Sequence, residues 1–136
     1  MDLYYNLNKW IDAKARILHF ANDYGQLDML IALQEAERKI DSFIVLDENR
    51  AVAKSNYIVK KRKIKYLNPK EPIVLKKYDV VMISDENAIV DLETICKLAT
   101  TIILLKTKKL KENILNLGFD IATDIENLII LKKNLQ

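Results

Sequence analysis

Short apolar runs rich in isoleucine, leucine and valine recur along the chain, and polar or turn-forming residues bound each of them. A strand that is buried on both faces has this pattern, because none of its side chains meets water. We therefore predict strands over five such runs: Arg16–Ala21, Ile40–Leu46, Ile64–Leu67, Tyr78–Ser84 and Thr100–Leu105.

The segments between these runs place apolar residues three or four positions apart, which is the spacing of one helix face. The predicted helices cover Leu3–Ala15, Gln26–Arg38, Asn49–Lys61, Val90–Leu98 and Lys109–Leu117. Asn49 is expected to cap the third helix, because an Asn side chain accepts a hydrogen bond from a free N–H of the first turn. Gly118 is expected to end the last helix, because glycine adopts the left-handed conformation without strain.

Two further apolar runs close the pattern, Phe119–Thr123 and Asn127–Lys132. The turn between them is too short for a helical crossover, so this pair should be antiparallel. Strands that alternate with helices predict an α/β fold in which a largely parallel sheet has helices on both faces. We expect a single domain over residues 1–136, with an N-terminal helix in residues 1–15 and the core in residues 16–134.

Composition restricts the class of protein further. The chain has 136 residues, a net charge of +3 and one cysteine, so it cannot form an internal disulfide. No apolar run approaches the roughly 20 residues that cross a bilayer. We expect a protein of the cytoplasm without a membrane span.

Basic residues are unevenly distributed. Between Arg50 and Lys77 there are ten Lys or Arg residues and one acid, Glu71. Such asymmetry is compatible with an anionic partner such as a nucleic acid. We favour a solvated lysine-rich surface, since charge alone is a non-specific sign and aromatic residues for base stacking are scarce nearby.

The order of the elements resembles that of the class I S-adenosylmethionine (SAM) methyltransferases. Five strand–helix steps, then Gly118-Phe119 and a closing hairpin, follow one another as in that family, over roughly residues 12–134. The resemblance implies a three-layer Rossmann-like sandwich with a seven-stranded sheet in the order 3-2-1-4-5-7-6. In this arrangement the last strand along the chain is the antiparallel one.

The first motif of the family is matched only in part. In the family, a strand and an acid precede a Gly-x-Gly-x-Gly loop. In this chain Ala21 and Asp23 stand at the first two glycine positions, and Gly25 matches the third. The resemblance implies that Ala21, Asn22 and Gly25 border the methionine part of SAM. Asp23 adds a negative charge where a ligand carboxylate would approach, so we expect SAM binding to be weak or absent.

The second motif matches better. Asp47 follows the second predicted strand, and an acid about 20 residues after the glycine loop reaches ribose hydroxyls in nucleotide-binding Rossmann folds. The resemblance gives Asp47 this role, with Glu48 as the second choice. Asn68, after the third strand, is implied to lie near the adenine.

Few residues suggest catalysis directly. Asp85, in the loop after the fourth strand, is a weak candidate for a base or substrate contact, and a helix cap is the favoured interpretation. His19 stands where the family has its acid, and we expect a buried, hydrogen-bonded histidine more than a catalyst. Cys96 is expected to be a small buried hydrophobe. No group of residues has the spacing of metal ligands.

Two functions therefore remain open. The first is a small SAM-dependent methyltransferase, and the second is a non-catalytic Rossmann-like domain that binds a protein or a nucleic acid. A receiver-like signalling domain is a weaker third alternative. That fold ends in a helix, whereas this chain is predicted to end in a hairpin.

Overall fold

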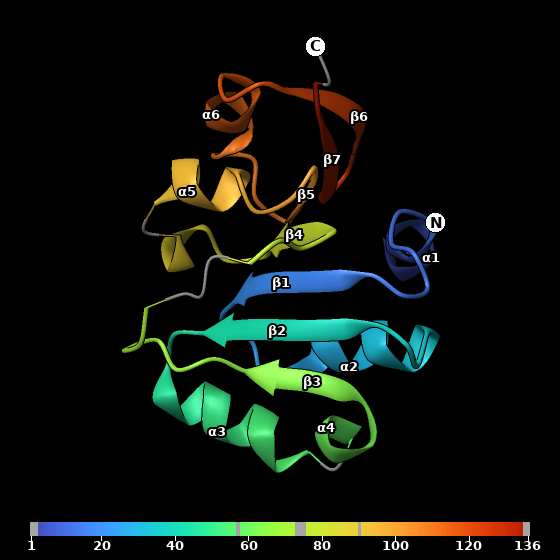
Figure 1. The fold of residues 1–136 in the computed structure, drawn as a ribbon, viewed down its shortest axis with the longest axis vertical. Helices are drawn as coiled ribbons and strands as arrows, with labels where there is room; N and C mark the ends of the chain where they lie inside the picture. Colours follow the sequence, from blue (N-terminus) through green and yellow to red (C-terminus); the bar gives the residue numbers. More distant parts are fainter. Residues whose placement is uncertain (1–2, 57, 73–75, 90, 135–136) are drawn as a thin grey trace.

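A seven-stranded sheet forms the centre of the computed structural model, which describes residues 3–56, 58–72, 76–89 and 91–134. The strand order is β3-β2-β1-β4-β5-β7-β6, from the bottom to the top of Figure 1. The strands are β1 (Arg16–Ala21), β2 (Lys39–Ile44), β3 (Lys63–Tyr66), β4 (Val80–Ile83), β5 (Thr101–Leu105), β6 (Phe119–Ile125) and β7 (Leu128–Lys133). Only β7 runs against the direction of the other six strands, so its pairs with β5 and β6 are antiparallel and the remaining pairs are parallel. The predicted order and direction of the strands are confirmed.

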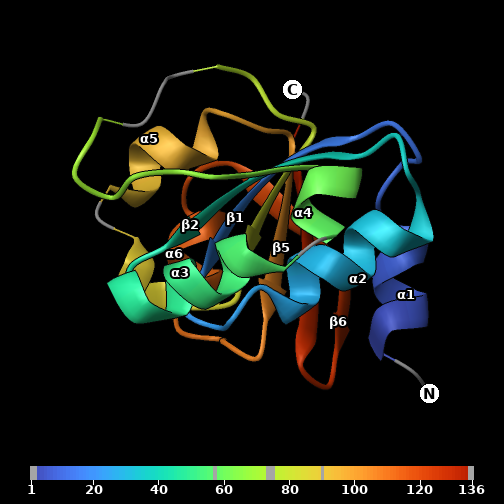
Figure 2. The same cartoon turned by 90° about the horizontal axis from the view of Figure 1, so that it is seen from below.

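Helices cover both faces of this sheet. They are α1 (Leu3–Lys9), α2 (Gln26–Gln34), α3 (Asp47–Ser55), α4 (Ile58–Lys61), the short 3₁₀ helix η1 (Glu86–Ala88), α5 (Leu92–Cys96) and α6 (Lys111–Leu115). Figure 2 shows α1 and α2 on one side of the sheet and α5 on the other. Among the described residues, no helix is long and apolar enough to cross a membrane.

The two faces of the sheet make two separate apolar cores. Along β1, Ile17 and Ala21 pack in the core under α1, α2 and α3, whereas Leu18 and Phe20 pack in the core under α5 and α6. Successive side chains of a strand point to opposite faces, so a strand between two helical layers must be apolar at nearly every position. The largely apolar run of β1, interrupted only by the buried His19 within residues 17–21, has this physical cause.

The helical segment after β2 differs from the prediction. It begins at Asp47, so Asn49 is not its cap but a residue of its first turn. The amide of Asn49 instead donates to the backbone oxygen and the side-chain oxygen of Asn22, at 3.3 and 3.4 Å. The segment also breaks into α3 and α4, because Asn56 is extended and its side chain accepts from the N–H of Ile58 at 3.0 Å. Asn competes with the helix in this way through its short polar side chain.

One buried side chain lies at the ends of both α1 and α2, which are shorter than predicted. The guanidinium group of Arg38 is almost wholly buried and donates to the backbone oxygens of Ile11 and Ile31 at 2.5 and 3.2 Å. It also donates to the side-chain oxygens of Asn8 and Gln34 at 2.7 and 3.1 Å. Arg38 also donates to the backbone oxygen of Asn8 in the last turn of α1 at 3.5 Å, whereas Ile11 lies just beyond that helix. The last carbonyls of a helix have no partner within the helix, so Arg38 binds the C-terminal ends of α1 and α2 at once.

We expect Arg38→Met to lower the free energy of unfolding by about 3 kcal/mol or more, because each buried carbonyl left without a donor costs roughly 1–3 kcal/mol. Urea denaturation followed by circular dichroism measures this loss. The matched control is Lys54→Met in the last turn of α3, where the side chain is exposed. That substitution should change stability by less than about 0.5 kcal/mol. Equal effects of the two substitutions would contradict the role of Arg38.

Candidate functional site

A pocket lies at the carboxyl ends of the central strands. It has a volume of about 480 Å³ and is lined by Leu3, Asn22, Asp23, Gln26, Leu27, Ser84, Asp85, Leu105 and Lys106. β1 pairs with β2 on one side and with β4 on the other, so the chain reverses its direction of winding here. Ligands of open α/β sheets bind in the crevice at such a switch point.

The structure disperses the predicted site residues. Asn22 and Asp85 line the pocket together. Ala21 is wholly buried at the end of β1, and Asp47 lies in the first turn of α3. Asn68 lines a different pocket of about 260 Å³ beside β2 and β3. The predicted residues therefore do not line one continuous pocket.

The loop between β1 and α2 is built around Asp23 and Gly25. The carboxylate of Asp23 accepts hydrogen bonds from the N–H groups of Gly25 and Leu27, at 3.0 and 3.5 Å. These amides lie at the start of α2, where the helix dipole favours an anion. Asp23 therefore occupies, with its own carboxylate, two of the amides at the start of this helix.

Gly25 is required by packing as well as by backbone conformation. Its φ is +87°, and a Cβ atom at this position would lie 2.6 Å from the hydroxyl oxygen of Tyr66 and 2.9 Å from the Cβ of Ala53. Both neighbours come from elements beyond β2. The one glycine that the loop retains thus allows α2 to pack closely against β3 and α3.

Polar contacts of the chain itself cover the end of β2. Asp47 has a side chain that is 78% exposed, and it forms an ion pair with Arg50. Arg50 also donates to the backbone oxygen of Ile44 at 2.8 Å. The contact between Asn49 and Asn22 joins this region to the loop after β1. A ribose hydroxyl would have to compete with Arg50 for the carboxylate of Asp47.

A row of polar side chains lies buried beneath the pocket. His19 of β1 contacts Asp28 of α2, with 2.8 Å between Nδ1 and Oδ1, and both side chains are fully buried. On the other side of the ring, Nε2 lies 2.6 Å from the hydroxyl oxygen of Ser84. The predicted buried, hydrogen-bonded histidine is present.

The partners of His19 were not predicted from the sequence. Asp28 shares the buried face of α2 with Ile31 and Ala32. A lone acid at helical spacing among apolar residues was the available signal, because a buried charge needs a partner. Ser84 is 65 residues from His19 along the chain, and only the pairing of β1 with β4 brings the two together.

The charge of Asp28 controls the titration of its neighbours. Burial alone lowers the pKa of His19, but the charge and hydrogen bond of Asp28, with a smaller effect of Asp23, more than offset it, so the pKa is raised above 6.5. Burial and the charge of Asp28 also raise the pKa of Tyr66. Its hydroxyl and the second oxygen of Asp28 are both buried, and neither has a partner in regular hydrogen-bond geometry among the described residues.

The remaining candidates have structural explanations. Asp85 caps η1, since its side chain accepts from the N–H of Asn87 at 3.1 Å, and it also lies at the pocket. Cys96 is buried, which raises its pKa to about 11 and disfavours a reactive thiolate. No cluster of three or more potential metal ligands occurs among the described residues.

His19 is the single histidine of the chain, so its imidazole signals can be followed by NMR without overlap. We expect a titration midpoint above 6.5 in the wild type and a lower midpoint in Asp28→Asn, which removes the charge and keeps the shape. Because the folded-state pKa is raised, the pair contributes fully to stability below about pH 6.5 and loses this contribution as the pH rises through that pKa. A wild-type midpoint at or below 6.5 would show that the effect of Asp28 on the pKa of His19 does not exceed that of burial.

Solved structures share the fold of this chain, whereas comparisons of its sequence find no relative. No known family profile matches the sequence, and no curated protein matches it significantly. Among solved structures, a presumed RNA methyltransferase from Pyrococcus horikoshii has a TM-score of 0.68 at 16% identity, over 98% of this chain and 79% of the other. A presumed rRNA methylase from Clostridium thermocellum has a TM-score of 0.66 at 12% identity, over 98% and 94%.

A coclaurine N-methyltransferase solved with N-methylheliamine and S-adenosylhomocysteine (SAH) has a TM-score of 0.60 at 12% identity. The match covers 78% of this chain, which spans only 35% of that enzyme. The matched structures share an architecture at low sequence identity. The chain therefore has the Rossmann-like fold of the SAM-dependent methyltransferases.

Proposed function

We propose that this chain is a SAM-dependent methyltransferase domain whose affinity for SAM is weak. The observation that supports the site is the pocket at the carboxyl ends of β1 and β4, bordered by the loop after β1. In the methyltransferases that the chain resembles, the methionine part of SAM lies over this loop. SAM would supply the methyl group, and the residues of this chain would bind and orient it.

The weak affinity follows from the position of Asp23. Its carboxylate already accepts the N–H groups of Gly25 and Leu27, so a ligand carboxylate would have to displace it. The two negative charges would also repel each other. Asp47 is the proposed ribose ligand, Asn68 the proposed neighbour of the adenine, and Asp85 the proposed contact of the methyl acceptor.

Calorimetric titration with SAM and SAH tests this site. We expect Asp23→Gly to tighten binding at least tenfold, or by about 1.4 kcal/mol, because it frees the two amides and removes the charge. Asp23→Asn is the matched variant, since it removes the charge and keeps a side chain over the amides, and it should improve binding less. A wild-type complex at or below micromolar affinity would contradict the weak affinity, and no binding by Asp23→Gly would contradict the site.

Asp47→Ala, made in the Asp23→Gly background, tests the ribose contact. We expect it to weaken SAM binding by about 1–3 kcal/mol, the contribution of hydrogen bonds to a charged group. Asp120→Ala on β6 is the matched control, because Asp120 is exposed and lies on the far edge of the sheet. Unchanged affinity in Asp47→Ala would remove Asp47 from the site.

One observation favours the second candidate function, a non-catalytic binding domain. The end of β2 is covered by Arg50 and by the contact between Asn49 and Asn22, which leaves little polar capacity there for a nucleotide. A nucleic-acid partner would have to use the basic residues around α4 and β3. Part of that charge is already engaged, since Lys63 pairs with Glu37 at 3.3 Å and Arg62 donates to the backbone oxygen of Ala32.

A gel-shift titration over a range of salt concentrations tests the basic surface. We expect no measurable binding of RNA or DNA at physiological salt. Exposed lysines without base-stacking partners associate only weakly with phosphates, and salt screens that association. Binding that persists at physiological salt, and that is lost when Lys60, Lys61 and Lys63 are changed to Gln, would contradict this expectation. It would favour a nucleic-acid partner.

A further inference from the structure

We propose that Ser84, His19 and Asp28 form a nucleophilic relay, in which Ser84 is activated to accept an acyl group from a small ester that enters the pocket. The proposal goes beyond methyl transfer and does not depend on SAM. It is carried by three side chains from three elements that meet at two short polar contacts beneath one pocket.

The geometry orients the histidine for base catalysis. Asp28 Oδ1 lies 2.8 Å from Nδ1 of His19, so the carboxylate accepts the Nδ1–H of a neutral imidazole. In this tautomer the lone pair of Nε2 faces the hydroxyl oxygen of Ser84, 2.6 Å away. The same hydroxyl group also donates to the backbone oxygen of Phe20 at 3.3 Å, so its proton must turn from Phe20 to Nε2 for the relay to act. This is the sequence of roles that a serine nucleophile needs: a base within hydrogen-bond reach, and a buried acid that holds the base in the right tautomer.

Of the three side chains of the relay, Ser84 is the one that a ligand in the pocket can reach. His19 and Asp28 are fully buried, whereas Ser84 is partly exposed and lines the pocket. A ligand in the pocket therefore meets the hydroxyl group first. The pocket is within the usual size range for small ligands, and Leu3, Leu27 and Leu105 give it apolar walls that suit a short acyl chain.

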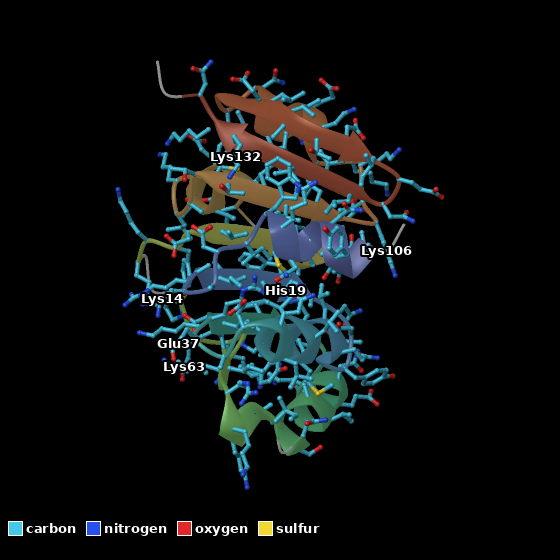
Figure 3. All side chains as sticks on the ribbon, turned by 90° about the vertical axis from the view of Figure 1, so that its right-hand side faces the viewer. Lys14, His19, Glu37, Lys63, Lys106 and Lys132 are labelled. Atoms are coloured by element: carbon cyan, nitrogen blue, oxygen red, sulfur yellow. The ribbon has the colours of Figure 1, made fainter. Side chains whose placement is uncertain are left out.

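Lys106 supplies the positive charge for the oxyanion that forms during acyl transfer. The backbone N–H groups of Ser84 and Asp85 cannot do this, because both donate to the backbone oxygen of Phe20, at 3.0 and 3.2 Å. Lys106 lines the same pocket. Figure 3 shows His19 well inside the molecule and Lys106 at its outer edge.

The backbone of Lys106 supports the same interpretation. Its φ is +60°, a conformation that costs a non-glycine residue roughly 1–2 kcal/mol, and its N–H donates to the backbone oxygen of Asn127 at 3.0 Å. Glycine would relieve this strain but would remove the charge from the pocket. A strained residue at a pocket is a common property of functional sites.

The reaction balances with the ester and water alone. The hydroxyl oxygen of Ser84 attacks the carbonyl carbon while its proton passes to Nε2 of His19, and Asp28 stabilises the imidazolium. The bond to the leaving alcohol then breaks, and the alcohol takes the proton from Nε2, which leaves an ester on Ser84. Water, deprotonated by the same nitrogen, releases the carboxylic acid and restores the hydroxyl group.

A fluorophosphonate probe tests the relay, because it reacts with activated serine hydroxyls by displacement of fluoride. Intact-mass spectrometry and peptide mapping locate the adduct. We expect one adduct, on Ser84, in the wild type and in Ser55→Ala, and none in Ser84→Ala. Ser55 is the matched control, since it is an exposed serine on α3 whose hydroxyl donates to the backbone oxygen of Val52 in the same helix.

Two further variants show whether the Ser84 hydroxyl is activated or is only exposed to the probe. Asp28→Asn should slow labelling of Ser84 by roughly 100-fold or more, because without the carboxylate His19 is no longer held in the tautomer that accepts the proton, and Lys106→Gln should slow it by a smaller factor. The labelling rate of the wild type should rise with pH through the NMR midpoint of His19, because only the neutral imidazole accepts a proton. Asp28, Asp23 and Ser84 face the ring, and Tyr66 lies beyond Asp28, so these groups set that midpoint.

Two results would overturn the proposal. One is the absence of an adduct on Ser84 in the folded wild type. The other is labelling of Ser84 at a rate that neither follows the titration of His19 nor falls in Lys106→Gln. Should Asp28→Asn fail to fold, the pH profile and Lys106→Gln still decide. Because the probe contains no SAM, failure here is distinct from failure of the calorimetric test.

Discussion

The contact between His19 and Asp28 is the interaction on which the arrangement of the site depends. Two ionisable side chains with no exposure to water are stable in the interior only if they are paired, and the 2.8 Å contact pairs Nδ1 of His19 with Oδ1 of Asp28. It joins the central strand β1 to the first turn of α2, directly under the loop that the resemblance associates with a ligand. Ser84 contacts this pair through Nε2 of His19, at 2.6 Å.

The helix α2 is consequently fixed at both ends by polar side chains rather than by apolar packing alone. At its start, Asp28 is held by His19 and Gly25 lies against Tyr66. Beyond its end, the guanidinium of Arg38 binds the carbonyl of Ile31 and ties α2 to α1. These contacts restrain α2 relative to β1 and α1 at both of its ends.

Much of the fold follows from local patterns, and most of the site does not. The run Arg16–Ala21 predicts β1 within its observed bounds, because burial on both faces leaves a clear apolar signature. The place of β7 between β5 and β6 has no signature of its own and came from the resemblance. Asn49 was wrongly expected to cap a helix, because Asn serves equally well in a side-chain contact with a distant loop. The partnership of His19 with Ser84 depends on strand pairing, which no periodicity encodes.

The position of β7 has a consequence for how the protein is made. β6 is synthesised before β7, yet β7 lies between β5 and β6 and supplies every hydrogen bond that holds β6 to the sheet. While the chain emerges from a ribosome, β5 must therefore expose an open edge, and β6 must wait without a partner until residues 128–133 appear. Closure of this half of the sheet therefore waits for β7, and until then the edge of β5 is an unpaired strand edge that other strands can join.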